Sequence, residues 1–236
     1  MEDRKNFIEL KVSDGSAMAA YVARPQTAGK HPGILVFQEA FGVNPYIRDV
    51  ADRFANEEFT AIAPELFHRT GRGFEGSYTD FSGTQPHVSK LTNENLEGDI
   101  KAGYEWLTKD SQTDSRNIFS IGFCMGGRVS FLADSVVPLK ASVSFYGGGI
   151  AQGLLDRAKN LLGPILMFWG GLDKHIRPEH SRAVEDALRA AGREFVNVTF
   201  SYADHGFFCD QRAAYNEQAS KQAWSMTLEF LKYHLK

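Results

Sequence analysis

A six-residue stretch, Gly122-Phe123-Cys124-Met125-Gly126-Gly127, places a candidate nucleophile between small residues. An apolar run at 118–121 precedes it, and residues 128–133 can form a helix after it. Strand, Gly-x-nucleophile-x-Gly and helix form the pattern of a nucleophile elbow, a turn so tight that the flanking positions need almost no side chain. The pattern predicts that Cys124 lies exposed at the C-terminal end of a strand, with backbone N–H groups of the next helix aimed at the same place.

An acid and a histidine further along the chain can complete a catalytic site with this cysteine. Asp173 follows a predicted strand and two glycines, and His205 lies between the last predicted strand and the last predicted helix. The order nucleophile, acid, histidine is the chain order of α/β-hydrolase triads, and each interval leaves room for about one strand–helix–strand unit. In such a triad a thiolate attacks, an imidazole takes its proton, and a carboxylate orients the imidazole. Asp204 is the alternative to Asp173 as the carboxylate that orients His205. We favour Asp173, because a residue adjacent to His205 does not easily reach the Nδ1 atom of its imidazole.

Other cysteine, histidine and glycine residues have more ordinary interpretations. Cys209 lacks flanking glycines, and we interpret it as a packing residue. His175, His180 and His205 lack the paired spacing of a metal site, and a Cys/His zinc site would need more thiolates. No lysine follows Gly147-Gly148-Gly149 in the spacing of a phosphate loop, so these glycines predict a tight turn. The sequence therefore predicts neither a metal nor a cofactor.

The candidate residues sit at the ends of segments that alternate between strands and helices. Such alternation predicts a mostly parallel central sheet with helices on both faces, here with an N-terminal antiparallel hairpin across 13–15. Ligand sites gather at the carboxyl ends of such strands. Residues 65 to about 92 form a long loop with one helical turn. The predicted strands are 8–12, 18–23, 33–37, 60–63, 117–122, 141–146, 164–169 and 195–202, and the predicted helices are 46–57, 94–109, 125–136, 179–191 and 216–233.

The composition fits a single α/β domain over residues 1–236. At 43% hydrophobic the chain can bury a full core, and its two cysteines cannot form a disulfide framework, which favours a cytoplasmic setting. The formal net charge of −3 does not indicate binding to nucleic acid or to an anionic membrane surface. The polar stretch 1–5 lacks the apolar core of a signal peptide, and the apolar runs are strand-sized, so no membrane span is expected. We expect a monomer or a weak homodimer.

Six motifs resemble those of the dienelactone hydrolase family, also called carboxymethylenebutenolidases, within the α/β-hydrolase superfamily. The resemblance extends from Gly33 to the closing helix, and the motifs together are far more specific than any one of them. They are Gln38-Glu39-Ala40-Phe41-Gly42-Val43-Asn44, Ala63-Pro64-Glu65-Leu66-Phe67, Gly122-Phe123-Cys124-Met125-Gly126-Gly127, Ser144-Phe145-Tyr146-Gly147, Gly170-Gly171-Leu172-Asp173 and Asp204-His205-Gly206-Phe207.

The resemblance implies a role for each of the matching residues. Cys124 is the nucleophile, His205 the base and Asp173 the residue that orients it. Glu39 is implied to lie beside the thiol, which stays protonated at rest until substrate binding moves the glutamate and the thiolate forms. Such an arrangement would protect the sulfur from oxidation. The oxyanion hole is implied at the backbone N–H groups of Met125 and Ala40. The loss of one such donor typically costs roughly 3–4 kcal/mol.

Two departures from the family pattern bear on the substrate. Family members that open dienelactones hold the substrate carboxylate with two arginines, one in the long loop or the helix after it and one four residues past the catalytic histidine. The second position here is Cys209, and no arginine occurs between Arg72 and Arg116. Arg69, Arg72, Lys90 or Arg128 could substitute, but nothing in the sequence directs any of them into the pocket. Without that bidentate clamp the pocket is expected to be more apolar. Its candidate lining residues are Phe41, Phe67, Arg69, Phe81, Tyr146, Phe207 and Phe208.

The sequence thus predicts a hydrolase that opens a lactone or a small carboxylic ester through a thioester at Cys124. Its only expected partner is that small-molecule substrate. The same nucleophile and donors could accommodate an aryl ester or a phosphotriester, whose transition state also carries charge on an oxygen. Two alternatives from other classes remain open: a non-enzymatic ligand-binding protein on a hydrolase scaffold, and a redox thiol protein that uses Cys124 and Cys209.

Overall fold

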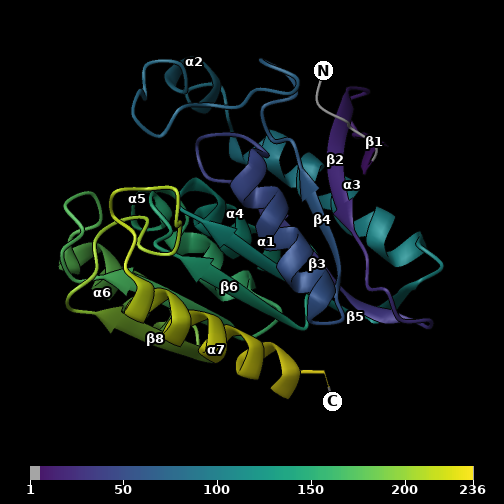
Figure 1. Ribbon diagram of the computed structural model, residues 1–236. Coiled ribbons are helices and arrows are strands. Elements are labelled where there is room, and N and C mark those ends of the chain that lie inside the picture. The colour runs from purple at the N-terminus through teal and green to yellow at the C-terminus, as the bar shows by residue number, and fades with distance from the viewer. Residues whose placement is uncertain (1–5, 236) are drawn as a thin grey trace. The chain divides into compact units, whose positions relative to one another are not determined.

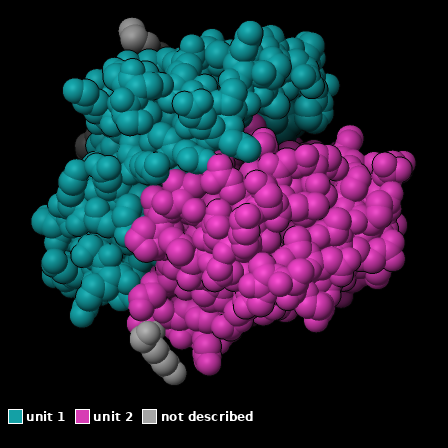
Figure 2. Space-filling view, turned by 180° about the vertical axis from the view of Figure 1, so that it is seen from behind, with its two compact units in different colours: residues 1–118 teal, residues 119–236 magenta. Residues whose placement is uncertain are grey.

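The computed structural model describes residues 6–235, so the polar stretch 1–5 discussed above and residue 236 lie outside the described residues. The chain divides into two compact units, residues 1–118 and residues 119–236, which Figure 2 shows in different colours. Each unit contains strands with helices packed against them. That the whole chain forms one domain stays a prediction.

The strands of the first unit combine a hairpin with a parallel pair. They are β1 (Phe7–Lys11), β2 (Ala17–Ala23), β3 (His31–Phe37) and β4 (Thr60–Pro64). β1 pairs with β2 and β2 with β4 in the antiparallel sense, whereas β3 and β4 are parallel. The hairpin turns at Gly15, whose φ of +86° is left-handed and suits glycine. The predicted N-terminal hairpin is therefore confirmed, with Leu10 opposite Met18.

The helices of the first unit begin where the sequence offers caps. They are α1 (Pro45–Asn56), α2 (Gln85–Val88) and α3 (Asn93–Lys109). The side chain of Asn44 accepts a hydrogen bond from the N–H of Ile47, and Pro45 occupies the first turn, where its missing N–H costs nothing. Figure 1 shows α1 in front of β3 and β4, with α3 behind them. Gly103 allows α3 to approach the sheet closely, because a Cβ there would lie 2.8 Å from the side chain of Leu35.

The second unit has parallel strands throughout. They are β5 (Thr113–Phe123), which contains the division between the two units, β6 (Ala141–Phe145), β7 (Ile165–Gly170) and β8 (Phe195–Phe200). β5 pairs with β6, β6 with β7 and β7 with β8, all in parallel. The predicted mostly parallel α/β architecture is confirmed. Because all four strands run the same way, the turns that follow them in this unit meet at one edge of the sheet.

Helices and aromatic packing complete the second unit. The helices are α4 (Met125–Asp134), α5 (Ile150–Gly153), α6 (Pro178–Ala190) and α7 (Glu217–Tyr233), with a 3₁₀-helix at Leu155–Asn160. Phe145 lies at the centre of the core, with its ring centroid 4.6 Å from that of Phe168 and 4.8 Å from that of Phe208. No helix within residues 6–235 has both the length and the apolar character needed to cross a bilayer.

The structure differs from the sequence-based expectation by more than two residues in two places, and elsewhere the bounds of the predicted elements shift by one or two residues at most. β5 begins at Thr113, four residues earlier than predicted, because its polar first residues read as a loop. The segment after β6 forms α5 and the 3₁₀-helix, neither of which we predicted. They have four and six residues, which is too short for helical periodicity to show in the sequence.

Candidate active site

Cys124 sits on a strained turn between β5 and α4. Its φ of 55° and ψ of −117° are a conformation that non-glycine residues rarely adopt. Its N–H donates to the carbonyl of Phe145 at 3.0 Å, which ties the turn to β6. Strained backbone of this kind is characteristic of functional positions and persists only where the surroundings enforce it. Cys124 is partly exposed, whereas the strand residue before it is fully buried.

Two glycines make the turn sterically possible. A Cβ on residue 122 would lie 1.9 Å from the carbonyl oxygen of Gly126, so only glycine fits. A Cβ on residue 127 would lie 2.6 Å from the carbonyl oxygen of Phe145 and 2.9 Å from the Cα of Gly147. The requirement at Gly127, which our sequence argument missed, lets the first turn of α4 pack directly against the end of β6. Both contacts fix where the Cys124 sulfur points.

His205 bridges Cys124 and Asp173. Its Nε2 lies 3.1 Å from the sulfur of Cys124, and its Nδ1 lies 2.7 Å from Oδ2 of Asp173. The rival acid, Asp204, accepts the backbone N–H of His205 at 2.6 Å and does not take the Nδ1 position. The structure therefore brings together the three residues that the spacing suggested, and all three belong to the second unit.

Close approach of two strand ends positions the acid and the histidine. A Cβ on Gly170 would lie 2.7 Å from the carbonyl oxygen of Ala203, and a Cβ on Gly171 would lie 2.6 Å from the Cα of Ser201. These glycines at the end of β7 therefore allow the backbone there to pack closely against residues 201–204, which follow β8. Oδ1 of Asp173 then accepts the backbone N–H groups of His175 at 2.7 Å and Ile176 at 2.9 Å. The carboxylate is thereby held on one side by its own loop and on the other by the imidazole.

The electrostatics favour a charged imidazole and a charged acid. Burial of the His205 ring works against its protonation, but the neighbouring sulfur of Cys124 and the hydrogen bond to Asp173 outweigh this and raise the pKa of His205 to about 10. Burial alone would raise the pKa of Asp173, but its hydrogen bond to His205 and the nearby imidazole charge hold that pKa below its usual value. Both shifts favour the charged forms of His205 and Asp173, so the arrangement stabilises the imidazolium that forms when the ring takes a proton.

Glu39 and Ala40 follow β3 in the first unit. Glu39 is buried, with 1% of its surface exposed, and the side chain of its neighbour Gln38 accepts the N–H of Leu66 at 3.1 Å. The amide of Gln38 also donates to the carbonyl of Glu39 at 3.3 Å. These bonds fix the backbone of the turn after β3. A buried carboxyl group at a strand end is a costly feature that often marks a functional site.

Arg69 does not have the surroundings of a substrate clamp. Its guanidinium donates to both oxygens of Asp99, at 2.9 and 3.0 Å, and its Nε donates to Asp14 at 2.7 Å. Asp99 is fully buried on α3, so Arg69 compensates its charge. Arg72, in the same loop, pairs with Glu9 at 2.8 Å. The charge of Arg69 thus joins the hairpin turn and α3 to the long loop, and its place in the substrate pocket stays a prediction.

The aromatic candidates fall into two groups. Phe81 is 49% exposed, and its ring lies 5.1 Å from that of the buried Phe41. Phe67, Tyr146, Phe207 and Phe208 are all buried. Phe208 stacks on Phe123 at 5.4 Å and belongs to the core, whereas the ring of Tyr146 lies 5.1 Å from that of His205. Which of these aromatic residues line the substrate pocket stays a prediction.

His175 is a residue of the site that sequence reasoning set aside. Its ring lies 5.4 Å from that of His205, at an angle of 75°. Its position two residues after Asp173 was the only available signal, and a lone histidine in a loop is ordinarily a surface residue. Within residues 6–235, no group of three or more His, Cys, Asp or Glu side chains has the arrangement of a metal site.

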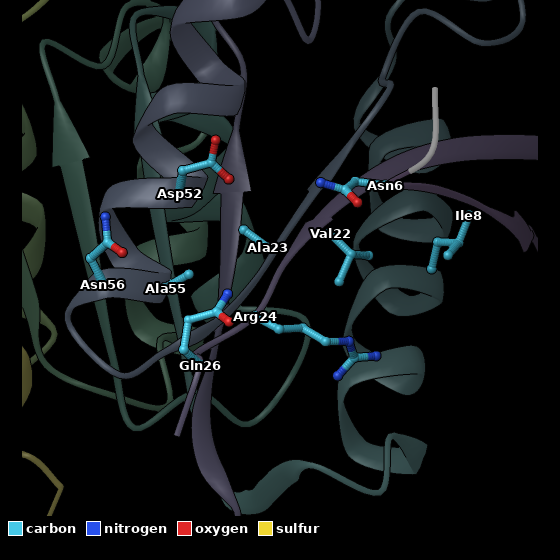
Figure 3. A pocket seen from close by; sticks show the side chains of 9 residues that line it. All are labelled: Asn6, Ile8, Val22, Ala23, Arg24, Gln26, Asp52, Ala55 and Asn56. Atoms are coloured by element: carbon cyan, nitrogen blue, oxygen red, sulfur yellow. The ribbon is translucent and has the colours of Figure 1, made fainter. Parts of the chain in front are cut away.

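A cavity of the first unit involves none of the predicted site residues. It measures about 490 Å³, and Figure 3 shows its lining. The guanidinium of Arg24, which lies on its wall, already forms a bidentate pair with Asp110 at 2.8 and 2.9 Å. The carboxyl group of Asp52 accepts the hydroxyl of Tyr21 at 2.9 Å. The lining residues are Asn6, Ile8, Val22, Ala23, Arg24, Gln26, Asp52, Ala55 and Asn56.

Comparison with known proteins identifies the family. The sequence model of the family described as "Dienelactone hydrolase family" matches residues 18–235, which is most of the chain. The chain belongs to the dienelactone hydrolase family. It is 35% identical over 228 residues to the "Putative carboxymethylenebutenolidase" of a Synechocystis strain, with 93% of each chain covered. The protein of the same name from Escherichia coli K12 is 35% identical over 233 residues, covering 94% of this chain and 84% of the relative.

Solved structures of this family share the fold. The "Putative Dienelactone Hydrolase" of Klebsiella pneumoniae matches with a TM-score of 0.86 and 34% identity, covering 96% of this chain and 98% of that one. A dienelactone hydrolase-like promiscuous phosphotriesterase from metagenomic libraries matches with a TM-score of 0.84 and 23% identity, covering 96% and 97% of the two chains. These likenesses confirm the α/β-hydrolase fold. As a dienelactone hydrolase family member, the protein is a carboxylic ester or lactone hydrolase.

Proposed function

We propose that this protein hydrolyses lactones or small carboxylic esters through a covalent thioester at Cys124. The single observation that carries this proposal is the continuous contact from sulfur to imidazole to carboxylate, with distances of 3.1 Å and 2.7 Å. Both lie in the range at which a proton can pass or be held. The strained turn that presents Cys124 gives independent support.

The reaction consists of two acyl transfers. The Cys124 thiol gives its proton to Nε2 of His205, and the sulfur forms a bond to the carbonyl carbon while the C=O electron pair moves to oxygen. The tetrahedral oxyanion collapses, the C–O bond breaks, and His205 returns the proton to the leaving alkoxide. Water then attacks the thioester as His205 takes its proton. The C–S bond breaks, the acid is released, and His205 passes its proton back to the sulfur.

Two backbone N–H groups are assigned to the oxyanion. The N–H of Met125 belongs to the first turn of α4, where an α-helix leaves its N–H groups without partners inside the helix. The N–H of Ala40 follows β3, in the position that supplies the second donor in α/β-hydrolases. Donors fixed in advance of the reaction stabilise the developing charge without reorganisation. Asp173 contributes by holding the imidazole in the tautomer that presents Nε2 to sulfur.

Glu39 is assigned to the resting state of the thiol. A buried carboxylate near sulfur disfavours a second negative charge, so it would keep Cys124 protonated until substrate enters. Such control matters because a permanent thiolate beside an imidazolium is readily oxidised. The two cysteines are free, and a reactive thiol is best preserved in a reducing compartment, so we also propose a cytoplasmic setting.

Uncharged substrates are the better candidates. The two arginines of the long loop, Arg69 and Arg72, are both paired with carboxylates of this chain. The position four residues past His205 holds the buried Cys209. Exposed Phe81, packed on Phe41, offers an apolar surface instead. We therefore infer that the enzyme prefers neutral lactones and aryl esters over substrates that carry a carboxylate.

Phosphotriesters form a second candidate substrate class. The solved relative described as a promiscuous phosphotriesterase has this fold, although at 23% identity the likeness extends to the fold alone. A phosphotriester also develops charge on an oxygen in its transition state, which the same donors could stabilise. This activity would be a side reaction of the ester site and should be lost with Cys124.

Substitution of the two cysteines tests the proposal directly. We expect Cys124→Ala to abolish hydrolysis of p-nitrophenyl acetate and of a simple lactone, because no other nucleophile is in place. Cys209→Ala is the matched control, since it removes a thiol that lies outside the triad and should leave turnover within a few-fold of the unmodified protein. Full activity in Cys124→Ala would overturn the covalent mechanism.

A further inference from the structure

Tyr146 combines a strained backbone with a ring that contacts the catalytic histidine. It follows β6 directly, and its φ of +38° is one that residues with a side chain rarely adopt. The residue is fully buried, and its ring centroid lies 5.1 Å from that of His205. Strain of this kind persists only where the surroundings enforce it, and it is concentrated at functional sites. The nucleophile Cys124 is strained in the same sense.

The peptide group between Phe145 and Tyr146 connects this residue to the nucleophile. Its carbonyl accepts the N–H of Cys124 at 3.0 Å, and its N–H donates to the carbonyl of Phe168 at 2.7 Å. Both ends of one rigid planar unit are therefore hydrogen-bonded, one to the elbow and one to β7. The backbone of Tyr146 is thus fixed relative to that of Cys124.

Close packing just after Tyr146 explains its strained backbone. A Cβ on Gly147 would lie 2.5 Å from the hydroxyl oxygen of Ser144 and 3.0 Å from the carbonyl carbon of Gly127. The chain therefore turns sharply at Tyr146 in order to pass beside the first turn of α4. The close contact that lets the elbow form thus also sets the backbone that carries the Tyr146 ring.

Core aromatic rings hold the ring of Tyr146 in place. Its centroid lies 5.3 Å from that of Phe207 and 6.1 Å from that of Phe145, both in edge-to-face geometry. Phe207 and Phe145 are fully buried. Because such an interior is close-packed, the ring of Tyr146 cannot move away from the imidazole. His205 is itself only 8% exposed, so its position and charge depend on this neighbour.

We propose that Tyr146 is a positioning residue whose ring holds the His205 imidazole in line with the Cys124 sulfur and stabilises its charged form. This inference rests on the proposed triad mechanism. An aromatic ring within about 6 Å of a cation attracts it, and burial strengthens that attraction. The imidazole becomes charged when it takes the proton of Cys124, so the ring favours the step in which the nucleophile forms.

Other groups of the second unit also act on the charge of His205. Its Nε2 faces the sulfur of Cys124, its Nδ1 faces Asp173, and the ring of His175 lies 5.4 Å away. Asp204 accepts the backbone N–H of His205. The remaining charged or titratable side chains on α4 and on the loops 171–177 and 201–216 are Arg128, Asp134, Lys174, Arg177, Tyr202, Cys209, Asp210, Arg212 and Tyr215, and segment 147–153 carries none. A substitution at position 146 leaves all of these in place, so a change in the pKa of His205 between variants reports the ring.

Two substitutions at this position separate the ring from its hydroxyl. Tyr146→Leu removes the ring and keeps an apolar side chain, whereas Tyr146→Phe keeps the ring, and both carry the same backbone strain. We expect Tyr146→Leu to lower kcat for an uncharged aryl ester by about three- to tenfold, as expected for the loss of one aromatic contact, with little change in KM. Tyr146→Phe should restore most of this loss. Phe131→Leu, which removes a fully buried ring about two helical turns past Cys124, is the matched control and should leave kcat unchanged.

The pKa of His205 supplies a readout that a merely structural role would not move. NMR of the ¹⁵N-labelled imidazole measures it in a Cys124→Ala background, where no thiolate contributes and Asp173 remains. Because loss of the ring disfavours the charged imidazole, the pKa of His205 should be lower by about half to one unit in Tyr146→Leu than in Tyr146→Phe. Phe131→Leu should leave this pKa unchanged.

Increasingly fluorinated phenylalanines at position 146 test the electrostatic part of the proposal, even if Tyr146→Leu does not fold. Fluorine withdraws electron density from the face of the ring and nearly preserves its shape, so kcat and the pKa of His205 should fall stepwise along the series. An unchanged pKa of His205 along the series, or a Tyr146→Leu variant whose KM rises while kcat is unchanged, would overturn the inference. Failure of the triad mechanism itself is distinguishable, because Cys124→Ala would then keep its activity whatever the pKa of His205.

Discussion

The carbonyl oxygen of Gly126 lies 1.9 Å from the point where a Cβ on Gly122 would stand. The backbone of β5 just before Cys124 and the backbone of α4 just after it are therefore in direct contact, with no room for a side chain between them. This contact forces the chain to reverse within a few residues and leaves the sulfur at the end of β5. The geometry of the nucleophile is thus decided by residues that take no part in the chemistry.

Substitution of Gly122 by alanine should consequently damage the fold as well as the activity. We expect Gly122→Ala to lower the free energy of unfolding by more than about 3 kcal/mol, because backbone atoms must move to relieve the overlap. Urea unfolding followed by circular dichroism measures this loss. Gly148→Ala is the matched control, since the nearest atom to its Cβ is 4.0 Å away. Equal stability of the two variants would contradict the account of the elbow.

The two aspartates near His205 should differ sharply in their effect on turnover. Asp173→Asn removes the acceptor at Nδ1 and favours the wrong imidazole tautomer, so kcat should fall by about 10⁴. Asp204→Asn keeps an oxygen that can accept the backbone N–H of His205, so kcat should stay within about tenfold. Steady-state kinetics with an uncharged aryl ester distinguishes the two. A larger loss in Asp204→Asn would reverse the assignment of the acid.

The arginines of the long loop should affect stability rather than catalysis of neutral esters. Arg69→Met leaves the fully buried Asp99 without its bidentate partner and should cost about 3 kcal/mol of unfolding free energy. Arg72→Met breaks a pair whose side chains are 57% and 58% exposed, so it should cost about 1 kcal/mol or less. A selective loss of carboxylate-bearing substrates in Arg69→Met, without a loss of stability, would show instead that Arg69 binds substrate.

Asp134 should make stability depend on pH in the acid range. It accepts hydrogen bonds from Ser142 at 2.5 Å, Gly163 at 2.8 Å and Leu162 at 3.1 Å, and burial raises its pKa to about 6. Because the pKa is higher in the folded state, the folded protein holds a proton between about pH 4 and 6 that the unfolded chain releases. The contribution of Asp134 to stability is therefore greatest at low pH and is lost as the pH rises through about 6.

Urea unfolding of the unmodified protein and of Asp134→Asn at pH 4.5 and pH 7 tests this dependence. Asparagine does not titrate, so the stability of the unmodified protein relative to the variant should decrease between the two values. A relative stability that stays constant or increases would mean that the pKa of Asp134 is not raised in the folded state.

The sequence was most informative where local sterics and chain order dictate the outcome. Glycines around Cys124 required a tight turn, and the order of Cys124, Asp173 and His205 placed them at successive strand ends of a parallel sheet. These features depend on short motifs and on alternation, both of which can be read without a structure. The α/β fold followed for the same reason.

Features that depend on long-range pairing could not be derived in this way. Arg69 pairs with the buried carboxylate of Asp99, and nothing in the local sequence links the two positions. The requirement for Gly127 arises from contact with Phe145 on another strand, and the contact of His175 with His205 joins two separate loops. Tertiary packing creates each of these relationships.

The most direct test of the central claim is the mass of the enzyme during turnover. Rapid acid quenching of the protein with p-nitrophenyl acetate, followed by intact mass measurement and peptide mapping, should reveal one acetyl group on Cys124. His205→Ala should prevent its formation, and Cys209→Ala should not. Turnover with no acyl group on Cys124, or with the acyl group on another residue, would contradict the account.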